Sequence, residues 1–590
     1  EGTMKPEFEC HPLSWDAELQ DDTAILDIVD LPKKASNLSV LEHDCYGCSP
    51  RLGCFFEDGL AGGARLLLNT SYGPNLLVVY DYEGKKLCES VLDPGNLGHY
   101  VYNTSYCGTT EQTPGESVIY PYIVAIVGLL LLCIAYDIVQ IIKSWTHGTE
   151  REDPQNVAFD VDSARNGRRI PSISAFRGLA IVLMIFTNTG GGGLRFFNHT
   201  SWDGLTLGDI ILPMFVFCVG LTMQVLMSHR YLKRSKSAWR CFRLKAIGVL
   251  IVNGGYYLDT LRTLGVLQRI ALTQAAAAPL LNIWNVTQDD IRDADRPESV
   301  QSRIEDSERD QNDEITTEAS ETNDATVNLV ASSDPVNPRI GFFRRTFGEW
   351  RYVGMPMLIV HFVLTPLIFL LYRFQVGNCP SGYLGPGGRD MGGAYKTCTG
   401  GVAGAFDRFA LRTHIYTNPT SKALYDSIDF DPEGLFSTPF AVLNVVAGAH
   451  AGMILRFYPK RSSQAIRFGA YGSACILIAS ALHFTVMPIN KNLWSLSYAY
   501  VTIGISYLIY LCIRFVVDRE NSILPLKTLQ IVGNNALVIY ILQELFANRI
   551  PLQFYVGHEI IRRTFLSLWS TLLCVLIAHA LESYGIHYSL

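Results

Sequence analysis

Eleven apolar stretches, each long enough to cross a lipid bilayer as a helix, are the dominant feature of this sequence. A membrane-spanning helix needs roughly 20 predominantly apolar residues. That requirement is met near residues 119–142, 173–191, 207–228, 240–258, 264–285, 353–373, 437–456, 466–487, 494–516, 526–546 and 564–584. Only 17% of the 590 residues are charged, whereas a soluble chain is about a quarter charged. We therefore expect an α-helical polytopic membrane protein with about eleven transmembrane helices, not a cytosolic enzyme.

The segment 1–116 has a different character from the rest of the chain. Its short apolar runs alternate with Gly, Asn and Pro turns, which predicts a small β-rich domain. Six of the 14 cysteines lie before residue 110, and glycosylation sequons begin at Asn37, Asn69 and Asn103. These features indicate a disulfide-bonded, glycosylated domain on the luminal side, and we expect the chain to begin after a cleaved signal peptide.

Two further cysteines flank a glycine-rich loop within 375–435, so eight cysteines are candidates for disulfides. They are Cys10, Cys45, Cys48, Cys54, Cys88, Cys107, Cys379 and Cys398. Zinc binding by Cys45 and Cys48 is the weaker alternative, because no second ligand pair follows at zinc spacing. We expect no metal site.

The positive charges of the short loops predict the orientation, because Lys and Arg concentrate on the cytoplasmic side. With 1–116 in the lumen, the first transmembrane helix lies within 117–145 and helices two to five lie within 170–286. An acidic loop follows at 287–350, and the remaining helices, six to eleven, lie within 351–590. The loop 375–435 then lies in the lumen. The luminal placement of Arg562 and Arg563 is the one conflict with this rule.

The acidic loop accounts for the negative charge of the chain. Residues 287–338 hold 15 Asp and Glu against 4 Arg and no Lys, which leaves the rest of the chain at +4 from a total of −7. Such a polar segment buries too little apolar surface to fold, so we expect a disordered cytoplasmic loop. No basic face with interleaved aromatic residues is present, which argues against nucleic-acid binding.

Polar side chains at membrane depth are costly, so each one is a candidate for a functional site. The densest group follows the second predicted span and includes Asn188, four consecutive glycines at 190–193, His199 and Asp209. An imidazole can take a proton from an amine or can itself attack a thioester. A purely structural role in the loop is the alternative for His199. The other intramembrane charges, taken singly, are more often structural pairs than catalysts.

Several sequence blocks resemble those of the heparan-α-glucosaminide N-acetyltransferase family of lysosomal transmembrane acetyltransferases. They start at Phe176, His199, Gly265, Asp431 and Pro488, and the glycine-rich loop after Cys379 narrows the resemblance to this family. The resemblance extends over the whole chain except the acidic loop. This sequence differs from the family at Ser174, where the family commonly has Asp, so we assign no carboxylate role to that position.

The resemblance implies transfer of the acetyl group of cytosolic acetyl-CoA to the terminal glucosamine amine of heparan sulfate in the lysosome. It also implies a lysosomal membrane location and a homodimer. The family's catalytic histidine and asparagine fall on His199 and Asn188, and Asp209 or Glu433 is the candidate carboxylate that orients the imidazole. The candidate residues for binding acetyl-CoA are Arg177, Arg269, Asn490, Lys491 and Trp494.

Two questions stay open at this level. His199 can act as a base in a ternary complex or can carry the acetyl group itself. A transporter of a sugar or anion with a luminal receptor domain is the alternative function, since it needs only the spans and the buried charges. The absence of an internal repeat counts against the inverted-repeat transporter folds.

Overall fold

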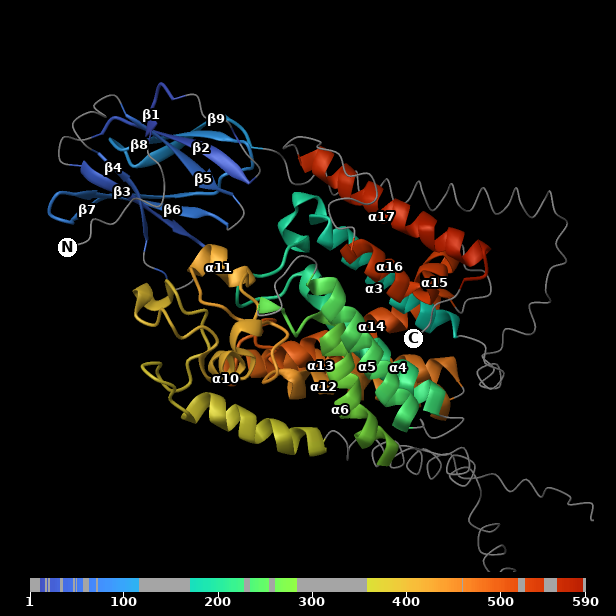
Figure 1. The fold of residues 1–590 in the computed structure, drawn as a ribbon. Helices are drawn as coiled ribbons and strands as arrows, with labels where there is room; N and C mark the ends of the chain where they lie inside the picture. The colour runs from blue at the N-terminus through green and yellow to red at the C-terminus, as the bar shows by residue number, and fades with distance from the viewer. Residues whose placement is uncertain are drawn as a thin grey trace, which may run out of the picture.

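In a computed structural model, the chain forms an N-terminal β domain and a helical domain that follows it (Figure 1). The structure describes residues 11–115 with short gaps, 170–227, 234–253, 260–283, 358–458, 460–517, 526–545 and 560–586. The predicted first span 119–142, the acidic loop 287–350 and Cys10 lie outside the described residues.

The β domain confirms the predicted β-rich segment and consists, in the residues described, of two sheets packed face to face. One sheet has the order β1-β5-β2-β8-β9 and the other β4-β3-β6-β7, with only β2 and β8 running parallel. Alternate residues of β5 are buried, as expected for a half-covered strand. The strands are β1 His11–Pro12, β2 Thr23–Val29, β3 Ala35–Glu42, β4 Arg51–Phe55, β5 Ala64–Asn69, β6 Asn75–Asp81, β7 Lys86–Leu92, β8 His99–Asn103 and β9 Gly108–Thr113.

Disulfides occur where the sequence predicted them. Cys88 pairs with Cys107 beside the β-domain core, Cys45 pairs with Cys48, and Cys379 pairs with Cys398 in the glycine-rich loop. Cys54 is disulfide-bonded as well. Among the described residues, the free cysteines all lie on helices of the second domain. Oxidised cysteines are thus confined to the parts of the chain predicted to be luminal.

The helical domain contains six described helices that are long and apolar enough to cross a membrane, on α3, α4, α12, α13, α14 and α17. The helices are α3 Pro171–Asn188, α4 Leu207–Met227, α5 Arg234–Val252, α6 Val266–Ile283, α10 Gly401–Leu411, α11 Thr420–Tyr425, α12 Thr438–Phe457, α13 Arg461–Thr485, α14 Leu496–Val517, α15 Leu526–Asn534, α16 Ala536–Leu545 and α17 Ile560–Ser583. A further apolar helix covers Leu358–Arg373.

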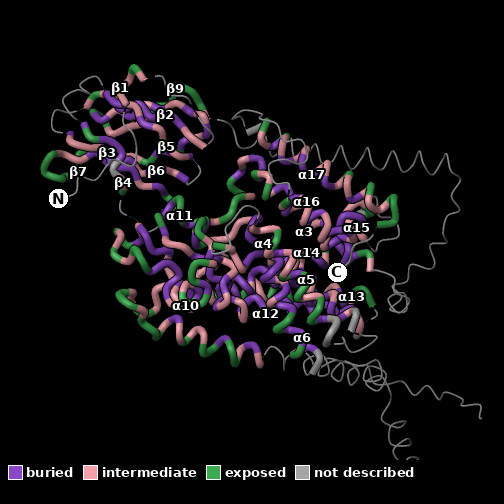
Figure 2. Tube along the Cα trace, viewed as in Figure 1, coloured by how far each residue is buried: buried purple, intermediate pink, exposed green. Residues whose placement is uncertain are grey.

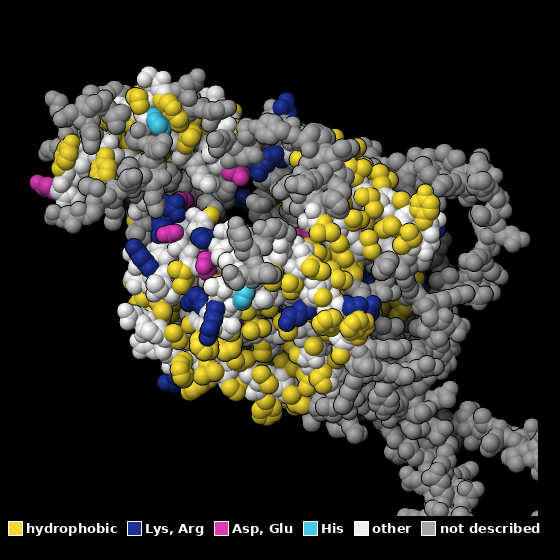
Figure 3. Space-filling model, in the orientation of Figure 1, with side chains coloured by type: hydrophobic (Ala, Val, Ile, Leu, Met, Phe, Trp, Pro, Cys, Tyr) yellow, Lys and Arg dark blue, Asp and Glu magenta, His cyan; other side chains and the backbone are white. Residues whose placement is uncertain are grey.

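Helix α12 is the centre of the helical domain and packs against α4, α6 and α14 (Figure 2). Helix α13 instead exposes Ile466, Leu477 and Phe484. Hydrophobic side chains cover much of the helical domain on the face drawn in Figure 3. An apolar core and an apolar outer surface together are what a domain surrounded by lipid requires.

The predicted span 526–546 is not one helix, which corrects the sequence analysis. It divides into α15 and α16 at the buried Asn535, whose backbone N–H donates to the carbonyl of Val532, three residues earlier. The hydroxyl of Ser174 on α3 donates to the side-chain oxygen of Asn534 at 3.0 Å. A hydropathy pattern detects the apolar run but not a buried polar turn inside it.

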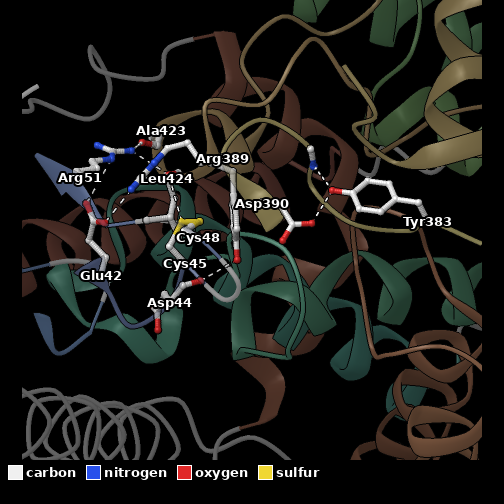
Figure 4. Close-up of a disulfide and its surroundings, with 12 residues drawn as sticks. Glu42, Asp44, Cys45, Cys48, Arg51, Tyr383, Arg389, Asp390, Ala423 and Leu424 are labelled. Atoms are coloured by element: carbon white, nitrogen blue, oxygen red, sulfur yellow. Dashed lines mark hydrogen bonds and ion pairs between the residues drawn. A yellow bond between two sulfur atoms is a disulfide. The ribbon is translucent and has the colours of Figure 1, made fainter. Parts of the chain in front are cut away.

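The β domain contacts the loop 375–435 through the Cys45–Cys48 disulfide (Figure 4). Both cysteines are buried and belong to the same hydrophobic cluster as Leu424 and Tyr425 of α11. The hydroxyl of Tyr425 donates to the carbonyl oxygen of Asp44 at 2.9 Å. We name this contact the disulfide interface.

Charged residues extend the disulfide interface. The buried carboxylate of Glu42 lies 3.8 Å from Nε of Arg51 and 3.7 Å from Nη1 of Arg389, so cations of both domains share one anion (Figure 4). Arg51 also donates to the carbonyl oxygen of Leu424 at 2.9 Å. The β domain is therefore fixed on the helical domain by apolar and by ionic contacts.

Candidate active site

Two loops that are far apart in the sequence are joined at the N-terminal ends of α4 and α14. Asp203 and Asn490 form a backbone bridge, and the side-chain amide of Asn490 donates to Asp203 at 2.9 Å. The amide of Asn492 donates to the carbonyl oxygen of Ser201. Burial raises the pKa of Asp203, and the hydrogen bond from Asn490 opposes this effect. The joined loops form a rigid base for the residues between them.

His199, Asp209 and Lys491 meet on this base. Nδ1 of His199 lies 2.9 Å from Oδ1 of Asp209, and Nζ of Lys491 lies 2.9 Å from the same nitrogen and 3.3 Å from Oδ1 of Asp209. When Nδ1 donates its proton to Asp209, Lys491 pairs with the carboxylate, and the lone pair of the imidazole is on Nε2. The side chain of His199 is 35% exposed, so this nitrogen is accessible.

Asp209 has two functions because its two oxygens face different groups. Oδ2 accepts hydrogen bonds from the backbone N–H and the hydroxyl of Thr206, directly before α4, at 3.2 and 2.9 Å. The same oxygen accepts from the hydroxyl of Thr200. The fully buried carboxylate is thus fixed in place, and Oδ1 is directed at the imidazole.

A pocket that is partly open to the surroundings lies among α3, α4, α5, α6 and the α15–α16 turn. Its walls are mainly apolar, but Arg177 of α3 and Arg240 of α5 both line it. Arg177 donates to the hydroxyl of Thr222, while Nε of Arg240 is buried without a hydrogen-bond partner. Among the described residues no carboxylate forms an ion pair with either guanidinium, so this cavity has two cations available for an anion.

One face of α3 extends from this cavity to the C-terminal end of the helix. Arg177, Ile181 and Met184 line the cavity, and Asn188 follows at the same helical spacing. Arg177 and Asn188 are therefore separated by roughly 16 Å along the helix axis. The amide of Asn188 donates to Gln543 and Glu544 of α16 at 3.1 and 3.3 Å.

The helices that carry these groups lie in a segment that is similar to known proteins. A family model described as the catalytic part of heparan-alpha-glucosaminide N-acetyltransferase matches residues 169–287, which include Arg177, Asn188, His199, Asp209 and Arg240. The chain is 33% identical over 435 residues to the heparan-alpha-glucosaminide N-acetyltransferase of Homo sapiens, a match of 70% of this chain and 58% of the human protein. It is 28% identical over 630 residues to the Mus musculus protein of the same name, a match of 96% of this chain and 88% of that protein.

The chain is thus similar to heparan-α-glucosaminide N-acetyltransferases, in the matched catalytic part and over most of its length. The match to the human protein thus spans somewhat more than half of that protein's length. The family resemblance stated from the sequence blocks is confirmed. The sequence resemblance proposed several positions as site residues. The structure separates these residues into three groups.

Glu433 forms the first of these groups, because it pairs with a cation and not with the imidazole. Nη2 of Arg262 lies 2.7 Å from Glu433 and 2.9 Å from Asp431. Burial opposes ionisation of Glu433, but Arg262 and Lys491 hold its pKa below the usual value. Burial raises the pKa of Asp431. Of the two candidate carboxylates, only Asp209 contacts His199.

Arg269, Trp494 and Asn490 form the second group, which is buried and bonded within the protein. Arg269 is fully buried and donates to the carbonyl oxygens of Pro432 and Gly434 at 3.0 and 2.9 Å. Its guanidinium lies 4.9 Å from the ring centre of Trp494, whose indole N–H donates to Asn444. These three residues support the loops of the site from behind.

Arg177, Lys491 and Asn188 form the third group and remain accessible to a ligand. Sequence reasoning missed Arg240, although a cation at the first residue of the predicted span 240–258 was the available signal. It also placed Lys491 at a phosphate, whereas Lys491 contacts His199. Among the described residues no group of three or more His, Cys, Asp or Glu gathers to hold a metal ion.

Proposed function

We propose that this protein is a membrane acetyltransferase that moves the acetyl group of acetyl-CoA onto the terminal glucosamine amine of heparan sulfate. The observation that carries the proposal is the imidazole of His199, oriented by Asp209 and exposed at the luminal end of the helix that also lines the arginine-containing cavity. The similarity to heparan-α-glucosaminide N-acetyltransferases, which includes their catalytic part, supports this reaction and its substrate.

The donor occupies the cavity in this proposal. Acetyl-CoA carries several phosphates, and Arg177 and Arg240 offer guanidinium groups that suit them and that no described carboxylate pairs with. The apolar wall between Arg177 and Met184 accommodates the uncharged arm of the donor. The thioester then lies toward Asn188, whose amide is the proposed donor to the carbonyl oxygen as it becomes negative, in exchange for its present bond to Glu544.

The acceptor approaches from the lumen. Glucosamine arrives protonated in an acidic compartment, so a base must free its amine before attack. Nε2 of His199 takes this proton, and the freed amine nitrogen forms a bond with the thioester carbon. The carbon–sulfur bond then breaks with release of the CoA thiolate, which takes the proton from His199, while the nitrogen loses its second proton to water as the amide forms. Asp209 stabilises the imidazolium while it carries the proton. Alternatively, Nε2 first accepts the acetyl group and then passes it to the amine.

The proposed reaction has to overcome a problem of access, because the membrane separates its two substrates. Acetyl-CoA is polyanionic and stays on the cytosolic side, while the β domain and its disulfides lie in the lumen of the lysosome. The reaction therefore needs a polar path across the bilayer, and Arg177 and Asn188 mark the two ends of one face of α3. We also propose that the protein acts as a homodimer. A solute transporter remains the competing function, but none of the contacts described here favours it.

Acetylation of a glucosaminide by protein reconstituted in lipid vesicles tests the proposal. The wild-type protein should transfer label from acetyl-CoA outside the vesicle to a glucosaminide inside it, and His199→Ala should abolish transfer while CoA still binds. Mass spectrometry of His199 after incubation with acetyl-CoA alone separates the two chemical routes. Uptake of the glucosaminide without consumption of acetyl-CoA would instead establish a transporter.

A further inference from the structure

Two arginines connect the β domain with the loop that leads to His199. Arg195 lies four residues before His199 and donates from Nη2 to the carbonyl oxygen of Thr70 at 2.5 Å. Nη1 of Arg563, on α17, lies 3.3 Å from the carboxylate of Asp22. The backbone N–H of Thr70 donates to the carbonyl oxygen of Asp22 at 2.8 Å, so both arginines contact the same edge of the β domain. We name this second contact the arginine interface.

The arginine interface continues into the four glycines. A Cβ atom at Gly193 would lie 2.7 Å from Cζ of Arg563, so the guanidinium packs directly on the glycine backbone, whose φ of +73° also favours glycine. Ser567 accepts a hydrogen bond from the N–H of Gly192 and donates to the carbonyl oxygen of Thr189. Helix α17 thus holds the glycine segment from one side and, through Arg563, joins it to the β domain.

This contact explains a conflict in the charge pattern of the chain. Arg562 and Arg563 lie on the luminal side, against the tendency of cations to remain in the cytoplasm. Arg563 has a specific partner in Asp22 and a specific surface in Gly193. The contacts of Arg563 therefore account for an arginine at a position where the positive-inside tendency alone would not predict one.

The two contacts of the β domain differ in what they touch. The disulfide interface fixes the domain on the loop 375–435 through Cys45, Cys48 and Leu424. The arginine interface reaches the segment from Thr189 to Asn198, directly before His199. A displacement of the domain edge at Thr70 would therefore move the segment that carries the imidazole.

We propose that the β domain positions His199 through Arg195 and Arg563, which act as positioning residues and do not contact the reacting atoms. This inference rests on the proposed role of His199 in acetyl transfer. The β domain would then take part in the reaction, because the position of the His199 imidazole depends on contacts with this domain.

The test compares Arg195→Ala and Arg563→Ala in the full-length protein. Both variants should lower kcat by roughly ten- to a hundredfold, as expected for a misplaced catalytic group, with the KM for acetyl-CoA unchanged. The loss should be equal for a monosaccharide glucosaminide and for a heparan oligosaccharide. Arg195→Lys, which can still donate to Thr70, should recover most of the rate. Lys396→Ala removes an exposed luminal cation outside both interfaces and should leave kcat as in the wild type.

A readout independent of turnover keeps this inference separate from the proposed function. Hydrogen exchange of the amides from Thr189 to Thr206 should become faster in both alanine variants and stay slow in Lys396→Ala. If exchange is faster in both alanine variants but the wild-type protein itself shows no acetyltransferase activity, the proposed function is refuted and the structural link is retained. Unchanged exchange and unchanged kcat would overturn the inference. A raised KM confined to the oligosaccharide would also overturn it, because Arg195 would then bind the anionic acceptor directly.

Discussion

Nδ1 of His199 and Oδ1 of Asp209 lie 2.9 Å apart, and the carboxylate is buried while the ring is partly exposed. The carboxylate therefore orients the imidazole, and when it accepts the proton of Nδ1 the lone pair of the ring is on Nε2. In Asp209→Asn the amide still caps α4 through its oxygen but no longer stabilises the imidazolium. We expect kcat to fall by about 10³–10⁴-fold, with the KM for acetyl-CoA little changed. Steady-state kinetics in both substrates measures this, and a loss below tenfold would contradict the assignment.

Gly208 is packed too closely to accept a side chain. A Cβ atom there would lie 2.7 Å from the carbonyl oxygen of Phe197 and 3.1 Å from Nδ1 of His199. Gly208→Ala should therefore displace the catalytic loop and abolish transfer, while the helices remain folded. Gly469→Ala on α13, whose Cβ would meet nothing closer than 4.0 Å, is the matched control and should retain full activity. Equal activity of the two variants would show that the loop tolerates the shift.

Arg177 and Arg240 should determine the affinity for the donor. Removal of one charge-assisted hydrogen bond to a phosphate costs about 1.5–3 kcal/mol, so each alanine variant should weaken CoA binding about ten- to a hundredfold. Calorimetric titration with CoA measures the change, and salt should reduce it. Arg243→Ala changes an exposed cation on the same helix, outside the cavity wall, and should bind CoA normally.

Asp407 on α10 should make the stability of the region around this helix depend on pH. Burial raises the pKa of this carboxyl to about 6, although it accepts hydrogen bonds from the N–H groups of Leu435 and Phe436. The folded protein therefore binds this proton more tightly than the unfolded chain does. Its stabilising effect is complete below the unfolded pKa of 3.8 and is lost as the pH rises through about 6.

The loss amounts to about 3 kcal/mol between acidic and neutral pH, at 1.36 kcal/mol for each pKa unit. Asp407→Asn keeps the acceptor oxygen but cannot ionise. Thermal unfolding in detergent at pH 4.5 and pH 7 should show a smaller difference for this variant than for the wild type. An identical difference in both proteins would exclude Asp407 as its source.

The sequence predicted those parts of the fold that depend on local patterns. Apolar runs located the helices, period-two alternation located the β domain, and cysteine spacing located the disulfides. His199 and Asp209 are ten residues apart, and the start of α4 between them brings the two side chains together. This pair could therefore be proposed from the sequence.

Contacts between distant segments could not be predicted in this way. Lys491 reaches His199 across 292 residues, and its partner depends on the bridge between Asp203 and Asn490. Arg269 looked like a cation for phosphate because only its position within an apolar span was known. The structure shows that it is fully buried and donates to backbone carbonyls of the loop before α12. Charge and depth alone do not distinguish a supporting arginine from one that faces a ligand.

The disulfide between Cys45 and Cys48 closes within the first part of the chain, but the surface it packs against is formed by Leu424, 379 residues later. During synthesis the β domain can therefore complete its own core long before its docking surface exists. The apolar patch around Cys45 and Cys48 therefore stays uncovered until α11 has been translated, and a ribosome stalled before residue 424 would leave it exposed.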